Sequence, residues 1–350
     1  MKFSNFLFEF FDSYKSCFDG YQIDFLTNSL SINEMSQKYS NINLIYDNEF
    51  GPKQNVEYIN KYYLKYDFII LHSLFDKRGV FHLNKDTYNK IVWRTWGHDS
   101  GFNSHNHLYK YLLFIPYEIK TKKVINKFSA ICIANIVDKI DIRKKYKKPA
   151  FFRINYSFSP IITDKEIIDN RKLNSPDVNI LVGHSGYKND NHIKIFKKLK
   201  HLINENVKIY VLLSYGNADY IQKVKKYGTK ILHNKIIFIE NFYKYDEYLK
   251  LLSNMDCIIL DGKKSYALGT INIMLNMNKR IFINSRSLIR KAFDICNVPY
   301  LCSNKISKLS IDYFVNNSKY DLPDDFIGHN IDYYIDTWRK LFDYLASLKG

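Results

Sequence analysis

The sequence predicts an α/β protein with two domains, and three observations support this. The 350-residue chain is longer than one hydrophobic core usually organises. Short apolar runs alternate with segments of helical periodicity along most of its length. A stretch rich in serine, proline and asparagine at 156–177 interrupts this alternation and marks a domain boundary. Such alternation is typical of parallel sheets with helical crossovers, so we expect two facing α/β domains with a cleft between them.

The expected elements follow from periodicity. In the first half, runs that we expect to be buried strands lie at 43–47, 67–73, 90–96, 129–135 and 150–154. In the second half they lie at 179–185, 207–215, 235–240, 257–262 and 279–284. Helical spacing aligns the apolar residues Ile195, Phe196, Leu199, Leu202 and Ile203, and likewise Tyr248, Leu251, Leu252 and Met255. We expect domains at 1–165 and 166–325, and a C-terminal helix within 326–350 that packs back on the N-terminal domain.

Composition excludes several classes of protein. With 46% hydrophobic and 16% aromatic residues, the chain can build a substantial core, which excludes intrinsic disorder as its main state. Its five cysteines are scattered and form no C-x-x-C pair, which argues against a disulfide framework and fits a reducing cytoplasm. No uncharged apolar run reaches the ~18 residues needed to span a bilayer, so we expect no signal peptide or transmembrane anchor.

The positive charge is concentrated in one segment. The chain carries a net charge of +17, and residues 120–148 alone hold ten lysines and arginines against two acidic residues. Such a segment would attract anionic lipid headgroups or phosphate, which predicts peripheral contact with a membrane. The alternative is a solvated basic loop. We do not expect a nucleic-acid partner, because the charge lies on no recognisable reading motif and the aromatic residues lie mostly within apolar strands.

The most informative segment is ILVGHSGYKNDNH at 180–192. Gly183, Ser185 and Gly186 end an expected strand, and residues 189–192 open a helix. Small residues let the backbone approach a ligand, and a helix N-terminus beside a serine hydroxyl can hold a phosphate. The motif matches neither the dinucleotide nor the Walker fingerprint, so an ordinary tight turn between strand and helix is the alternative.

A second junction, DGKKSYALGTINIML at 261–275, offers similar chemistry. Gly269 and Thr270 stand at the head of an apolar helix, with Lys263 shortly before them. Together with the first junction they could neutralise a pyrophosphate leaving group without a metal. The alternative is a capped structural helix with exposed lysines. Tyr215, in the loop after another expected strand, could line the same crevice.

The first half contributes WRTWGHDSGF at 93–102. Gly97 and Gly101 permit sharp turns that would leave His98 and Asp99 on a loop, where a base could meet an acceptor hydroxyl. The alternative is a buried aspartate that caps a helix. His72, at the end of a neighbouring strand, is a further candidate. We expect no metal site, because the nearby H-x-H lacks a matching set of carboxylates.

The order of these motifs resembles glycosyltransferase family 56, the bacterial transferases that add N-acetylfucosamine from its dTDP-sugar to a lipid-linked oligosaccharide. The segments that resemble the family's motifs are 72–75 (HSLF), 96–99 (WGHD), 180–186 (ILVGHSG), 191–192 (NH), 246–256 (DEYLKLLSNMD) and 268–270 (LGT). The resemblance extends over residues 65–300.

The resemblance implies a GT-B fold, with two Rossmann-like domains that bind the acceptor (N-terminal) and the donor nucleotide (C-terminal). It implies a metal-independent transferase without a cofactor, which moves a deoxyamino sugar from a dTDP donor to a lipid-pyrophosphate-linked saccharide. The setting would be surface polysaccharide synthesis of the enterobacterial-common-antigen type, at the cytoplasmic face of the bacterial inner membrane. Asp99 would contact the acceptor hydroxyl, with His98 and His72 as further candidates.

The expected diphosphate-binding set is Gly183, Ser185, Gly186, Asn191, His192, Tyr215, Lys263, Gly269 and Thr270. A GT-B nucleotide-sugar epimerase is the alternative enzyme, and product analysis with and without acceptor would separate the two.

Overall fold

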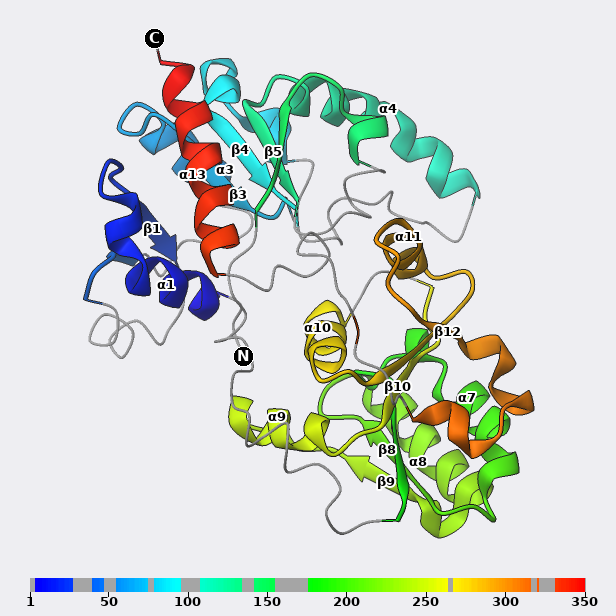
Figure 1. Ribbon diagram of the computed structural model, residues 1–350. Helices are drawn as coiled ribbons and strands as arrows, with labels where there is room; N and C mark the ends of the chain where they lie inside the picture. Colours follow the sequence, from blue (N-terminus) through cyan, green and yellow to red (C-terminus); the bar gives the residue numbers. More distant parts are fainter. Residues whose placement is uncertain are drawn as a thin grey trace. The chain divides into compact units, whose positions relative to one another are not determined.

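The computed structural model describes residues 4–27, 40–46, 55–74, 79–95, 108–133, 142–154, 176–263, 267–315, 320 and 331–349. The chain forms two units (Figure 1). Unit 1 comprises residues 1–159 and 328–350, and unit 2 comprises residues 160–327. The C-terminal segment therefore belongs to the same unit as the N-terminus.

Unit 1 is built on a four-stranded parallel sheet in the order β3-β4-β5-β6. Its strands are β3 (Ile69–His72), β4 (Ile91–Arg94), β5 (Ala130–Ile133) and β6 (Ala150–Arg153). A separate parallel pair joins β1 (Asp24–Thr27) and β2 (Asn43–Tyr46). Within the described residues, the helices of unit 1 are α1 (Ser4–Ser13), α3 (Asn55–Tyr62), α4 (Leu108–Ile125) and α13 (Ile331–Ser347). Strands β4 and β5 are fully buried, as expected for β5, which is entirely apolar, and for β4, which is apolar up to its last residue, Arg94.

The two ends of the chain share one aromatic core. On one face of the sheet, α1 contributes Phe10 and Phe11, and α13 contributes Trp338 and Leu341. The Phe11 ring lies 4.9 Å from the Trp338 ring, edge to face. The aromatic N-terminus is thus core rather than surface. The other face is covered by α3, α4 and short 3₁₀ segments, one of which is η2 (Gly79–His82).

Unit 2 holds a six-stranded parallel sheet in the order β12-β11-β10-β7-β8-β9. Its strands are β7 (Val178–Val182), β8 (Val207–Leu212), β9 (Ile236–Ile239), β10 (Cys257–Leu260), β11 (Arg280–Ile283) and β12 (Leu301–Cys302). Helices α7 (His192–Leu199) and α8 (Ala218–Leu232) cover one face. Helices α9 (Tyr245–Ser253), α10 (Leu268–Asn276) and α11 (Leu288–Ile295) cover the other. The strand order reverses between β7 and β10, the point at which doubly wound sheets bind ligands.

The α/β class and the ten expected strands are confirmed. The sequence pattern did not reveal β1, which is short and flanked by polar residues, or β12, which has two residues. The helix expected at the C-terminus begins at Ile331 and ends at Ser347.

We expect Leu341→Ala to destabilise unit 1 by about 2–5 kcal/mol, because Leu341 is fully buried and its removal leaves a cavity. All three tryptophans belong to unit 1, so tryptophan fluorescence during urea unfolding reports on this unit. Lys340→Ala, on the exposed side of the same helix, should change stability by less than about 0.5 kcal/mol. Equal effects of the two substitutions would show that α13 is not part of the core.

Candidate functional site

The loops that follow β7 and β8 are joined through two glycines. The amide of Gly186 donates to the Tyr215 carbonyl at 2.6 Å, and the Asn217 amide donates to the Gly186 carbonyl at 3.1 Å. A Cβ on Gly216 would lie 2.4 Å from the Gly186 backbone, and Gly216 also has a positive φ of 146°. These glycines therefore permit a backbone contact that no other residue would allow.

A buried carboxylate organises the turn after β7. Asp190 has no exposed surface, and it accepts hydrogen bonds from the Ser185 amide (3.0 Å), the Ser185 hydroxyl (2.7 Å) and His184 Nδ1 (3.0 Å). Burial alone would raise the pKa of Asp190, but the hydrogen bonds and charge of His184 and the Ser185 hydroxyl outweigh it and lower the pKa. Because Ser185 gives its one hydroxyl proton to Asp190, it supports the turn and has no proton left for a phosphate in this conformation.

Asn191 and His192 also point inward. Asn191 is left-handed (φ 56°), and its side-chain amide donates to the Asp261 carbonyl at 2.8 Å. His192 is completely buried, and burial lowers its pKa to about 4, so the ring is neutral near pH 7. Its Nε2 has no hydrogen-bond partner and faces Gly183, where a Cβ would lie 2.5 Å away. This contact explains why glycine is required at position 183.

The N-terminus of α10 is half-buried and leaves free space at Gly269. Ala267 precedes the helix in a left-handed conformation (φ 58°), and the first helical bond runs from the Ile271 amide to the Ala267 carbonyl at 2.9 Å. The amides at 268–270 precede that bond and have no acceptor within the helix. A Cβ on Gly269 would meet no protein atom within 4 Å. Thr270 Oγ1 shares a hydrogen bond with Tyr248 Oη at 2.9 Å.

Strand pairing brings the two junctions to the same edge of the sheet. Strands β7 and β10 are neighbours, and the Gly183 amide donates to the Ile259 carbonyl at 3.0 Å. Both loops therefore leave the sheet at its carboxyl edge. Lys263, in the second loop, has an exposed side chain.

Tyr215 was expected at this site from the sequence, but sequence reasoning missed Tyr187 and Phe242, which form a group of exposed aromatic rings with it at this edge. Tyr215 and Phe242 stack in parallel with ring centroids 5.8 Å apart, and Tyr187 lies edge-on to Tyr215 at 6.3 Å. Phe242 is 68% exposed. Burial raises the pKa of Tyr215 to about 12, so its phenol stays neutral. These rings follow β7, β8 and β9 in turn, and the signal was an aromatic residue just after each of three successive strands.

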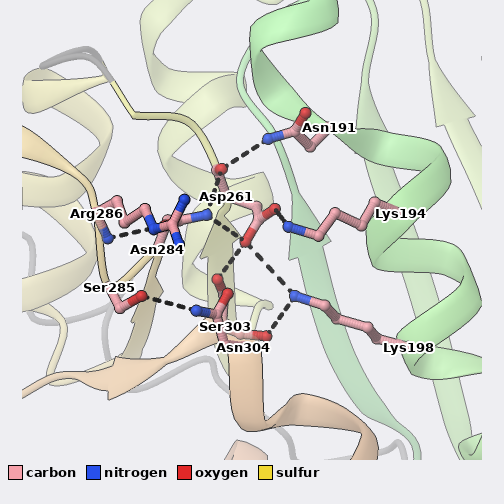
Figure 2. A network of polar contacts seen from close by, with 9 residues as sticks. All are labelled: Asn191, Lys194, Lys198, Asp261, Asn284, Ser285, Arg286, Ser303 and Asn304. Carbon is pink, nitrogen blue, oxygen red and sulfur yellow. Dashed lines mark hydrogen bonds and ion pairs between the residues drawn. The ribbon is translucent and has the colours of Figure 1, made fainter.

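Figure 2 shows a polar network around Asp261, at the end of β10. Its buried carboxylate accepts from Lys194 Nζ (3.2 Å), from Asn284 Nδ2 (3.1 Å) and from the Ser303 hydroxyl. Lys198 Nζ lies 3.6 Å from the same carboxylate, and burial lowers the pKa of this lysine. The network ties the ends of β10, β11 and β12 to α7, so the loop that leads to α10 starts from a fixed point.

In unit 1, polar residues gather where β3 and β4 end. His72 pairs in register with Arg94, and burial together with the Arg94 charge lowers the pKa of His72 to about 3. A neutral imidazole of such low basicity is suited to hydrogen bonding rather than to proton abstraction. Ser73 adopts a φ of 92°, and the buried hydroxyls of Ser73 and Thr95 have no hydrogen-bond partner in the part of the chain that the structure describes. His98 and Asp99 lie outside the described residues, so their roles stay predictions.

The basic segment contains the C-terminal half of α4 and residues 142–148. Lys145 donates to Glu118 at 2.7 Å and is partly buried, whereas Lys144, Lys147 and Lys148 are exposed. No helix in the described residues is long and apolar enough to cross a membrane. In the same residues, no group of three or more histidine, cysteine, aspartate or glutamate side chains could hold a metal ion.

A family model decides the class of this protein. The model for 4-alpha-L-fucosyltransferases, glycosyl transferase group 56, matches residues 35–344. The chain belongs to this family. It is therefore a glycosyltransferase, and the family assignment from the sequence motifs is confirmed. A nucleotide-sugar donor and an acceptor are its substrates.

Solved structures support the GT-B fold of this glycosyltransferase. A glycosyltransferase from Rickettsia africae is 16% identical, with a TM-score of 0.66 and coverage of 99% of this chain and 95% of that one. Alr3699/HepE from Anabaena, solved with UDP and glucose, is 11% identical, with a TM-score of 0.58 and coverage of 98% and 95%. A UDP-forming trehalose-phosphate synthase from Burkholderia xenovorans is 10% identical, with a TM-score of 0.60 and coverage of 97% and 86%. The expected GT-B class, with two Rossmann-like domains, is confirmed.

For this glycosyltransferase, we expect Gly269→Ala to raise stability and to lower nucleotide affinity. The new methyl group meets no protein atom, and alanine should stabilise the helix by about 0.5–1 kcal/mol. A diphosphate seated on the α10 amides would meet that methyl group, so affinity for dTDP measured by calorimetry should fall by about tenfold or more. Gly20→Ala, which also enters open space but lies in unit 1, should leave affinity unchanged. Unchanged affinity in Gly269→Ala would place the diphosphate elsewhere.

The buried His192 predicts a pH dependence for unit 2. Its folded pKa of about 4 lies below the ordinary histidine pKa of about 6.5, so the unfolded state binds the proton first as the pH falls. Stability should therefore drop between those two values, by about 2 kcal/mol at about pH 5. Hydrogen exchange of unit 2 peptides measures this loss, and His192→Gln should abolish it. His82→Gln, exposed and in unit 1, serves as the control. An identical pH slope in the His192 variant would contradict the assignment.

Proposed function

We propose that this enzyme transfers a deoxyamino sugar such as N-acetylfucosamine from a dTDP donor to a lipid-pyrophosphate-linked saccharide, without a metal. The observation that carries the proposal is the N-terminus of α10, with unpaired amides, the Thr270 hydroxyl and open space at Gly269. Nucleotide-sugar transfer needs charge stabilisation of a leaving diphosphate, and a helix N-terminus supplies it. The family description, 4-alpha-L-fucosyltransferase, supports a deoxy sugar.

In the proposed reaction, the acceptor hydroxyl attacks the anomeric carbon of the donor sugar. The bond between that carbon and the diphosphate oxygen breaks, and the bonding electrons leave with dTDP. The α10 amides and the exposed Lys263 would stabilise the negative charge that develops on the diphosphate. Asp99 would accept the proton of the acceptor hydroxyl. His72, held neutral beside Arg94, would contribute a hydrogen bond and no proton transfer.

The donor's nucleoside and phosphates would contact different groups. The stacked rings of Tyr215 and Phe242 present a flat apolar surface at the carboxyl edge of the sheet, from which the loop to α10 also leaves. A base or sugar ring can stack on such a surface. Gly183 and Gly186 would shape the loop around the donor, because protein atoms occupy the space where their Cβ atoms would lie. The side chains of Ser185, Asn191 and His192 would hold the turn in shape from inside.

A lipid-linked acceptor would bring the reaction to a membrane surface, which we propose to be the cytoplasmic face of the bacterial inner membrane in surface polysaccharide synthesis. The basic residues of 120–148 support peripheral binding there.

A panel of nucleotide sugars tests the proposal. Purified enzyme is incubated with each donor, with and without a lipid-pyrophosphate-linked saccharide, and products are identified by mass spectrometry. We expect transfer from the dTDP-deoxyamino sugar only when acceptor is present, and unchanged activity in a metal chelator. Conversion of the donor without acceptor would favour an epimerase. Binding of oligonucleotide in preference to dTDP-sugar would favour a nucleic-acid-binding protein.

We expect Asp99→Asn to lower kcat by about 10²-fold or more, because the amide keeps the shape of the side chain but cannot accept a proton. Calorimetry should show that dTDP affinity is unchanged. The substitution His82→Gln is a control for general effects on unit 1. Parent activity in Asp99→Asn would exclude it as the base, and loss of folding would instead indicate a structural cap.

A further inference from the structure

The outer face of α4 combines apolar and basic side chains. Ile115 and Ile119, four residues apart, point the same way and are 37% and 52% exposed. Lys122 and Lys123 continue this face one turn later and are exposed. Pro116 is also exposed beside Ile115. We call the set Ile115, Pro116, Ile119, Lys122 and Lys123 the α4 outer face.

The opposite side of α4 is already used by the core. Thr121 and Ile125 are buried, and Ile125 belongs to the hydrophobic core of unit 1. Tyr117, at the flank, has its ring 6.2 Å from that of Phe81 in η2, yet stays 49% exposed. The helix is therefore anchored through one side, and two isoleucines on the other remain in water. Large aliphatic side chains clustered on an exposed helix face indicate a contact surface.

The charge around this face indicates its partner. In the described parts of 115–150, the one acidic residue is Glu118, and Lys145 pairs with it at 2.7 Å. The exposed basic residues there are Lys120, Lys122, Lys123, Lys127, Arg143, Lys144, Lys147 and Lys148. An excess of positive charge next to exposed aliphatic groups matches an anionic bilayer, whose headgroups attract the lysines and whose acyl boundary accepts the isoleucines.

We propose that the α4 outer face docks on an anionic bilayer, with Ile115 and Ile119 inserted at the acyl boundary and Lys122 and Lys123 at the headgroups. The inference rests on the proposed function in so far as the lipid-linked acceptor brings the enzyme to a membrane. Docking through the α4 outer face differs in one measurable respect from a purely electrostatic attachment through the whole 120–148 segment. Insertion of apolar side chains survives high salt, whereas attraction between charges is screened.

Vesicle sedimentation tests the docking face directly. The probes are vesicles of phosphatidylethanolamine with phosphatidylglycerol, compared with vesicles of phosphatidylcholine. We expect the parent enzyme to bind the anionic vesicles and to keep part of that binding in high salt. Ile115→Gln with Ile119→Gln should lower vesicle affinity by about tenfold or more and abolish the salt-resistant part. Lys122→Gln with Lys123→Gln should weaken binding at low salt and leave the salt-resistant part.

Matched controls lie elsewhere on the surface. Leu64→Gln removes an aliphatic side chain that is 78% exposed in unit 1, and Lys223→Gln with Lys226→Gln removes two exposed charges from α8. Both controls should bind vesicles as the parent does. As all these positions are exposed, circular dichroism should show parent-like folding.

Two outcomes would overturn the proposal. The first is parent-like sedimentation of the isoleucine double variant. The second is an equal loss of binding in the Leu64 control, which would indicate non-specific adsorption. Transfer to a soluble acceptor analogue is measured in parallel. It should be unchanged in all α4 variants, so failure of the docking proposal is distinguishable from failure of the proposed transferase reaction.

Discussion

The carboxylate of Asp261 lies fully buried at the end of β10, where an ionised group is held only if several donors surround it. Two lysines of α7, the Asn284 amide and the Ser303 hydroxyl supply those donors. These donors belong to α7 and to the residues that follow β11 and β12. Their hydrogen bonds and ion pairs with Asp261 therefore fix the positions of α7 and of the ends of β11 and β12 relative to β10. The loop after Asp261 leads to α10. The contacts of Asp261 therefore also help to position the N-terminus of α10.

The turn after β7 is also held together by a buried carboxylate surrounded by hydrogen-bond donors. Asp190 gathers backbone and side-chain donors from within the turn, and His192 fills the space against Gly183. As a result, polar side chains that look like ligands in the sequence are turned inward and stabilise the loop. Among the described residues, the groups accessible at this edge include backbone N–H groups, exposed lysines such as Lys188 and Lys263, and flat aromatic rings. This set is suited to a diphosphate that carries a ring-containing nucleoside.

The two units differ in the surfaces that they offer. Unit 2 presents exposed aromatic rings at the carboxyl edge of its sheet, whereas unit 1 presents aliphatic and basic side chains along α4. Unit 1 also carries strained and unsatisfied polar groups at the ends of β3 and β4, among them Ser73 and Thr95. Under the proposed function, this division assigns the donor to one unit, and the acceptor and its lipid surface to the other. Under that proposal, one chain would serve a water-soluble substrate and a membrane-bound one.

The sequence by itself determined the α/β class, ten of the strands and the helix at the C-terminus, because buried parallel strands and amphipathic helices leave periodic patterns in the chain. The family was identified from the resemblance of several short segments to its motifs. The sequence also located the junctions at Gly183 and Gly269. Only the tertiary structure decided that Ser185 and His192 face inward, that Lys145 is paired with Glu118, and that Tyr215 stacks on Phe242. These outcomes depend on partners distant in sequence or on rotamers within a loop. A local pattern specifies which residues stand at a junction, but packing specifies where their side chains point.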